Sequence, residues 1–154
     1  MTWTSASGDL PSGSDVRFVG PGPEGTLFAA VQDGGTYRIF RGHRSSWHWE
    51  RKDGGIRGDE SVADICLLPD GSLIAASDNR VYRSDNTGDW WHQSYILNGQ
   101  NRRLQHVSGE TVLLVNESNA VHRSTDGGRS WHTFSSGIRT PDAVDLASTG
   151  SAAW

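Results

Sequence analysis

The sequence predicts an all-β protein, and three observations support this fold class. Short apolar runs of four to seven residues, rich in Val, Ile, Leu, Phe, Tyr and Trp, recur along the chain. Clusters of Gly, Asp, Asn and Pro separate these runs, as tight turns separate short strands. No window of the chain shows a convincing helical period. Together these features favour antiparallel sheets.

The runs repeat with a period of about 40 residues. Two markers share this period: the arginines Arg41, Arg83 and Arg123, and the Trp-His pairs at 47–48, 91–92 and 131–132. The repeated units span approximately residues 16–52, 62–98 and 103–137. Four strands in about 40 residues are typical of a propeller blade. We therefore predict a β-propeller with three four-stranded blades.

Each unit contains its four strands in the same order. The first is a short apolar strand, at 16–19, 65–68 and 104–107. A turn such as Pro69-Asp70-Gly71 leads into the second and most apolar strand, at 25–31, 71–76 and 110–115. The third strand, at 37–42, 80–84 and 120–124, carries the aligned arginine near its end. A polar turn follows it, and the fourth strand begins at the repeated Trp.

The turn before the fourth strand has a specific pattern. Residues 124–131 fit S-x-D-x-G-x-x-W at every fixed position, and residues 84–91 fit it with Asn86 in place of Asp. The short side chain can accept hydrogen bonds from amides of its own turn, and Gly supplies a positive φ. In the first unit the turn keeps only the terminal Trp, aligned as Trp47, and is one residue shorter.

These turns resemble the Asp-box, or bacterial neuraminidase (BNR), repeat found in sialidases, sortilin-like receptors, some xyloglucanases and a photosystem II assembly factor. The resemblance implies a β-propeller whose Asp-boxes lie on the outer rim, remote from active sites. A lone carboxylate in such a turn also lacks the further oxygens that calcium requires. We therefore assign a structural role to the residues of both turns: Ser84, Asn86, Gly88, Trp91, Ser124, Asp126, Gly128 and Trp131.

The two chain ends are out of phase with the repeat. Residues 1–8 match residues 130–137, so a strand at 2–8 is expected to be an outermost fourth strand. Residues 142–154 are expected to form the first two strands of a partial fourth blade. The N-terminal strand would complete this blade, either in the same chain or in a partner chain. We favour a homo-oligomer, a dimer above all, formed by strand exchange; a piece of a longer protein or closure of a single chain is the alternative.

Five residues are candidates for ligand binding. Trp49, Trp90 and Tyr95 fall outside the repeated aromatic positions, while Asp64 and Asp145 lie in predicted innermost strands that would line the central channel. Exposed aromatic rings beside polar groups suit sugars or peptides. We therefore predict a non-catalytic binding or scaffold module for carbohydrate or protein. The alternative, implied by the resemblance, is a sialidase-like or other glycoside hydrolase whose site forms only on assembly.

Composition excludes several other classes. The chain is one domain, 1–154, in which 34% hydrophobic residues and 19 glycines match a globular protein. The lone Cys66 excludes an internal disulfide, and no Cys/His spacing fits zinc, so no metal or cofactor is expected. A net charge of −4 argues against nucleic-acid binding. The apolar runs are too short to span a membrane and no signal peptide is evident, which favours the cytoplasm.

Overall fold

The computed structural model describes residues 8–118 and 120–134, which form twelve strands and one short 3-10 helix. Blade A contains β1 (Val16–Pro21), the 3-10 helix η1 (Pro23–Gly25), β2 (Thr26–Asp33), β3 (Thr36–His43) and β4 (Trp49–Arg51). Blade B contains β5 (Val62–Leu67), β6 (Leu73–Ser77), β7 (Arg80–Ser84) and β8 (His92–Ile96). Blade C contains β9 (Asn101–Ser108), β10 (Thr111–Asn116), β11 (Val121–Ser124) and β12 (His132–Thr133).

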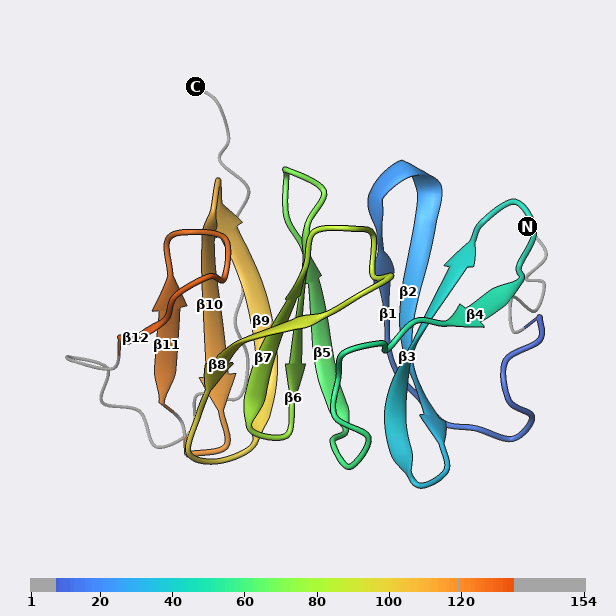
Figure 1. Ribbon diagram of the computed structural model, residues 1–154, viewed down its shortest axis with the longest axis horizontal. Helices are drawn as coiled ribbons and strands as arrows, with labels where there is room; N and C mark the ends of the chain where they lie inside the picture. The colour runs from blue at the N-terminus through green and yellow to red at the C-terminus, as the bar shows by residue number, and fades with distance from the viewer. Residues whose placement is uncertain (1–7, 119, 135–154) are drawn as a thin grey trace, which may run out of the picture.

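Each blade is a four-stranded antiparallel sheet in which neighbouring strands follow one another in the sequence. Figure 1 shows the three sheets side by side in chain order. The predicted all-β fold of three four-stranded blades is therefore confirmed. The described part of the chain contains no helix with the length and apolar character needed to cross a membrane. The partial fourth blade predicted from 142–154 and strand 2–8 falls outside the described residues.

The strand register corrects the alignment of the first repeat. Arg41 pairs with Glu50, just as Arg83 pairs with His92 and Arg123 with His132. The residue before each of these partners is therefore Trp49, Trp91 or Trp131, eight positions after the arginine in every blade. Trp49 is 7% exposed, whereas Trp47 is 39% exposed. The alignment on Trp47, and the shorter turn deduced from it, are wrong.

Two hydrophobic clusters of the described residues lie between neighbouring blades, and a third, with Ala29, Val31, Phe40 and Trp49, lies within blade A. Between blades A and B, Phe28 and Ile39 pack with Ile65, Leu73 and Trp91. The matching cluster between blades B and C contains Ile74, Val81, Leu104, Leu114 and Trp131. Burial of a Trp removes about 150–250 Å² from water, so the repeated Trp is the largest apolar contribution of each outer strand. Blades A and B, and blades B and C, therefore share a core across each interface.

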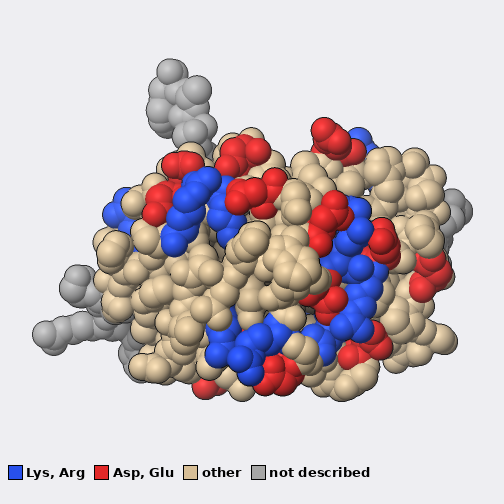
Figure 2. Space-filling model, in the orientation of Figure 1, with Lys and Arg blue, Asp and Glu red and all other residues tan. Residues whose placement is uncertain are grey.

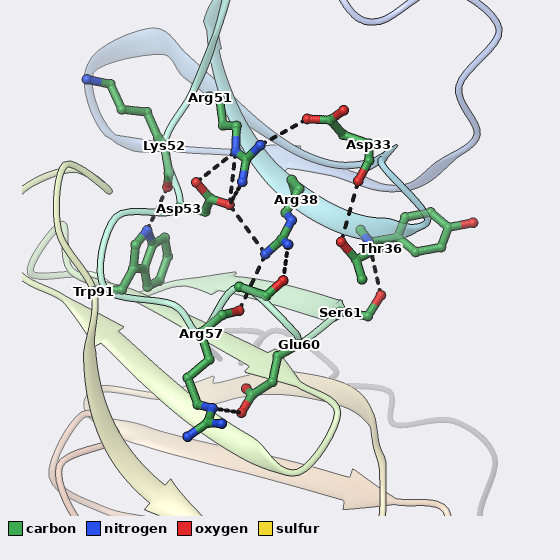
Figure 3. A network of polar contacts seen from close by, with 12 residues as sticks. Asp33, Thr36, Arg38, Arg51, Lys52, Asp53, Arg57, Glu60, Ser61 and Trp91 are labelled. Carbon is green, nitrogen blue, oxygen red and sulfur yellow. Dashed lines mark hydrogen bonds and ion pairs between the residues drawn. The ribbon is translucent and has the colours of Figure 1, made fainter.

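Polar contacts hold the linker between β4 and β5 against blades A and B (Figure 3). The Trp91 indole N–H donates to the Lys52 carbonyl over 2.8 Å. Arg51 binds the Asp53 carboxylate with its Nη2 2.8 Å away, and Arg38 approaches the same carboxylate at 3.7 Å. The linker is thereby fixed by side chains from both blades.

Candidate binding groove

The first strands of the three blades line one groove. Strand β1 pairs with β2 alone, β5 with β6 alone and β9 with β10 alone, so each carries one edge without a strand partner among the described residues. Residues 17–21, 63–67 and 103–106 of these strands enclose a hollow of about 870 Å³. An edge of this kind can pair with an added chain through those backbone N–H and C=O groups that are not already bonded.

Asp64 lies in the wall of this groove, as predicted for an innermost strand. Asp64 is 6% exposed. Its carboxylate accepts hydrogen bonds from the backbone amides of Leu104 and Ile65, both over 2.9 Å. Arg103 Nε lies 3.9 Å from the same carboxylate. Burial raises the pKa of Asp64, although these hydrogen bonds oppose the rise. Asp64 thus joins β5 to β9. The other predicted carboxylate, Asp145, lies outside the described residues.

The groove carries two arginines. Arg17 lies over the Tyr37 ring at 3.7 Å and donates to the Val62 carbonyl over 3.4 Å, so it reaches from β1 to β5. Arg103 projects from β9 with 53% of its side chain exposed. Because Asp64 is buried and already hydrogen-bonded, the solvent-facing charge of the described groove is positive.

Cys66 also lines the groove wall and is 9% exposed. Burial raises the pKa of its thiol to about 11, so the thiol stays protonated at neutral pH. Cys66 therefore packs as a small apolar side chain.

The two predicted S-x-[DN]-x-G-x-x-W turns have the same internal hydrogen bonds. Ser124 Oγ accepts the Gly128 amide over 2.8 Å, and Ser84 Oγ accepts the Gly88 amide over 3.0 Å. Each serine also donates to the Asp126 or Asn86 side chain, over 2.8 and 2.9 Å. Both glycines have a positive φ, 84° at Gly88 and 83° at Gly128, a conformation that favours Gly.

Asp126 closes its turn more fully than Asn86 does. Its Oδ1 accepts the amides of Arg129 and Ser130, over 3.0 and 2.9 Å, and its Oδ2 accepts the Ser130 hydroxyl over 2.6 Å. Burial acts to raise the pKa of Asp126, but the hydrogen bonds from Ser130, Ser124 and Arg129 outweigh it and lower the pKa to about 2. The carboxylate is therefore fully occupied within its own turn.

Two solved structures share this arrangement of strands. One is YCF48 from Cyanidioschyzon merolae, with a TM-score of 0.64 and 14% sequence identity; the match covers 82% of this chain and 38% of that protein. The other is YCF48 bound to D1 peptide, with a TM-score of 0.64 and 18% identity; it covers 84% of this chain and 42% of that protein. The fold is a β-propeller. This chain spans about two fifths of the length of these structures.

No family model matches the sequence, and no curated protein matches it significantly. The comparisons therefore show the propeller fold. The kind of ligand has to be inferred from the geometry of the site.

Trp90 is an exposed aromatic residue of the propeller surface. Its side chain is half exposed, at 51%, and its ring lies over the linker, where a Cβ on Gly54 would be 3.2 Å from the ring. Asp89 beside it pairs with Arg41 at 3.0 Å and with Lys52 at 2.9 Å. Acidic and basic side chains are likewise interspersed over the face shown in Figure 2.

The other two candidate aromatics pack within the propeller. Tyr95 stacks on Trp131 with ring centroids 6.4 Å apart and meets His122 edge-on at 6.0 Å, so it joins blade B to blade C. Trp49 packs with Phe40 in blade A, and its backbone amide donates to Asp9 over 2.7 Å. Packing of the blades accounts for both rings, because Trp49 holds the template position of blade A.

Sequence reasoning missed a carboxylate beside a tyrosine. The Tyr82 hydroxyl donates to Glu60 over 3.1 Å, and Glu60 also binds Arg80 and Ser77. Tyr82 is 1% exposed and Glu60 4% exposed, and burial raises the pKa of Tyr82. The protonated phenol therefore serves as a buried donor, out of reach of a substrate. Glu60 lies in a linker, and local sequence carries no signal for this contact.

Among the residues that the structure describes, no group of three or more His, Cys, Asp or Glu side chains is arranged to hold a metal ion.

Proposed function

We propose that this chain is a non-catalytic protein-binding scaffold whose groove takes an extended segment of a partner protein. The observation that carries the proposal is the groove of about 870 Å³ between three strands that each have one loose edge. An extended peptide can pair its own backbone with such an edge, while side chains around it select the sequence. Interblade packing makes the scaffold rigid before the ligand arrives, which limits the entropy lost on binding.

The comparison with YCF48 supports this class of ligand. The solved structure of YCF48 bound to D1 peptide has the same fold at 18% identity. We carry over only the kind of ligand, a peptide segment. In this chain the exposed Arg103 and Arg17 of the groove favour a segment with acidic side chains, since opposite charges steer association and fix the register of the ligand.

Fluorescence anisotropy with labelled ten-residue peptides tests this proposal. We expect acidic peptides of extended conformation to bind, and Arg103→Ala to weaken them by about tenfold, as loss of a charged contact does. Arg129→Ala is the matched control, because both side chains are 53% exposed and Arg129 lies outside the groove. Equal effects of the two substitutions, or no difference between acidic and basic peptides, would contradict the proposal.

A glycan is the second candidate ligand, and Trp90 favours it. An exposed indole flanked by Asp89 and Lys52 offers a stacking face next to polar groups, which suits a sugar ring. Screening a glycan array with the wild type and Trp90→Ala tests this role. Loss of signal in Trp90→Ala, with Trp47→Ala unchanged, would support it; equal signals in both variants would reject it.

The glycoside hydrolase alternative has less support. Hydrolysis requires two carboxyl groups about 5–9 Å apart at the sugar. The described lining of the groove contributes one, Asp64, and its oxygens are taken by the amides of Leu104 and Ile65.

We also propose that the turns of blades B and C are Asp-boxes, and that the chain works as a homo-oligomer. The shared hydrogen bonds of Ser84 and Ser124 support the first point. For the second, dimerisation by strand exchange through segments 2–8 and 142–154 remains a proposal, because both segments lie outside the described residues except for Gly8. Light scattering tests it.

A further inference from the structure

The two interfaces between blades use the same polar contact. Arg41 of blade A donates to the Thr87 carbonyl in the turn of blade B, over 2.8 Å. Arg83 of blade B donates to the Gly127 carbonyl in the turn of blade C. Thr87 and Gly127 hold the same position in their turns. The repeated arginine therefore recognises the turn of the following blade.

An apolar contact accompanies this hydrogen bond in both interfaces. A Cβ added to Gly88 would lie 2.7 Å from the Phe28 ring, and one added to Gly128 would lie 2.5 Å from Ile74 Cδ1. Phe28 pairs with Arg41 across the sheet, and Ile74 pairs with Arg83 in the same way. Each blade thus presents an arginine and an apolar side chain to the turn of the next.

Blade C presents the same pair of groups at its far side. Arg123 pairs with Leu113 across the sheet, so these residues correspond to the arginine and apolar residue of the two internal interfaces. Arg123 is exposed and lies 5.4 Å from the Phe134 ring, and Leu113 is half-buried.

Blade A exposes apolar residues where the following blades bury theirs. Val19, Ile65 and Leu104 hold equivalent positions in the first strands, opposite Ala29, Ala75 and Leu114. Val19 is 58% exposed, whereas Ile65 is 5% and Leu104 is 6% exposed. Likewise Val16 is 48% exposed and Val62, at the matching bulge of blade B, is 0% exposed. Among the residues that the structure describes, blade A therefore has the receiving half of an interblade interface without a partner blade.

We propose that a second copy of this chain docks its blade A on blade C of the first, in the way that blade B docks on blade A. Arg123 would donate to a backbone carbonyl in the exposed blade A turn of the second copy, where Ser45 aligns in sequence with Thr87 and Gly127. Val16 and Val19 of that copy would become buried. Ser46 replaces the turn glycine in blade A, and its extra Cβ would meet the flexible end of Leu113.

Such head-to-tail contacts close into a ring when the rotation permits it. The described blades of two copies would give six, within the range of about four to eight for propellers. The inference rests on the proposed homo-oligomer and gives it a different contact from strand exchange, because a fourth blade formed by the chain ends would occupy the same faces of blades A and C.

Light scattering across a dilution series of the full chain is the test. We expect a multiple of 16.8 kDa for the wild type, and a fall of the association constant by at least about tenfold in Val16→Asp and in Arg123→Ala. Two matched controls should leave the mass unchanged: Ile96→Asp, at a residue 54% exposed, and Arg129→Ala, at a side chain 53% exposed. Circular dichroism checks that Val16→Asp is folded. Arg123→Ala tests the same interface at an exposed residue, where the substitution should not disturb folding.

A monomer at every wild-type concentration would overturn the docking surface, and so would a multimer that survives both Val16→Asp and Arg123→Ala. Peptide binding by the Arg123→Ala variant separates this result from the groove proposal. Retained peptide affinity with loss of assembly would leave the groove function intact, because Arg123 lies outside the groove.

Discussion

At the position where blades A and B place Phe40 and Tyr82, blade C places His122. The side chain is 7% exposed, and neither ring nitrogen has a hydrogen-bond partner among the described contacts. Burial lowers the pKa of His122 below its usual value of 6.5. A lowered pKa in the folded protein means that the unfolded chain binds the proton more tightly, so stability falls as the pH drops below about 6.5 toward the folded pKa.

We therefore predict that His122→Phe stabilises the protein by about 1 kcal/mol at neutral pH, since it removes a buried polar group without a partner. The gain should increase at pH 5.5, because the proton-linked loss disappears with the imidazole. Urea denaturation at pH 7.5 and 5.5 measures both values. His92→Phe, at an exposed position, serves as the control. A pH dependence shared equally by wild type and His122→Phe would contradict the prediction.

A second prediction at the residue scale concerns the turn of blade C. Asp126→Ala removes the acceptor of the Ser124, Arg129 and Ser130 hydrogen bonds, so we expect a loss of about 1–2 kcal/mol, as for a lost cap. Because the folded pKa is lowered to about 2, the carboxylate stabilises the fold above pH 3.8, and this contribution is lost as the pH falls through about 2. Thermal melts between pH 2 and 7 should show this. The exposed Asp59→Ala should leave the melting temperature unchanged.

At the element scale, the outer strands were predictable where the repeat is regular. The Trp91 and Trp131 turns could be predicted because Ser, Asp or Asn, and Gly fix their own backbone through local hydrogen bonds. Blade A lacks the serine, having Gly42 at that position, and its turn closes through the His43 carbonyl, which accepts the amides of Ser46 and Trp47. Trp47 and Trp49 therefore both fit the sequence pattern for the first residue of the outer strand. The pairing of Arg41 with Glu50 assigns that position to Trp49.

This correction gives a paired prediction. Trp49→Ala should destabilise the protein by about 3–5 kcal/mol, as removal of a buried Trp does, whereas Trp47→Ala should change stability by less than about 1 kcal/mol. The difference follows from the 7% exposure of Trp49 against 39% for Trp47. Chemical denaturation of both variants measures it. A larger loss in Trp47→Ala would restore the alignment on Trp47.

At the scale of the whole molecule, contacts between blades were the part that the sequence could not reveal. Asp64 was predicted to lie on an innermost strand, but its bond to the Leu104 amide joins residues 40 positions apart. Periodicity reports which face of a strand is buried and carries no information on which neighbour fills the space. For the same reason the partner of Arg83, the Gly127 carbonyl 44 positions away, became visible only in the fold.

The contacts between blades also couple the stability of one blade to that of the next. The Arg83 guanidinium is 5% exposed, and it binds the Gly127 carbonyl and the carboxylates of Asp70, at 3.2 Å, and Asp85, at 2.6 Å. Because blade C packs on blade B through this arginine, Arg83→Ala should cost about 2–3 kcal/mol, as for hydrogen bonds to a buried charged group. The loss of stability should be concentrated in blade C, because in a repeat architecture each unit contacts little besides its neighbours. Amides of β10 and β11 should then exchange hydrogen at lower free energy than amides of β2 and β3.

The control is Arg123→Ala, measured at a low protein concentration. It should leave the hydrogen exchange of both sets of amides unchanged, because Arg123 is exposed. Equal loss of protection in blades A and C of Arg83→Ala would instead mean that the three blades unfold as a single cooperative unit.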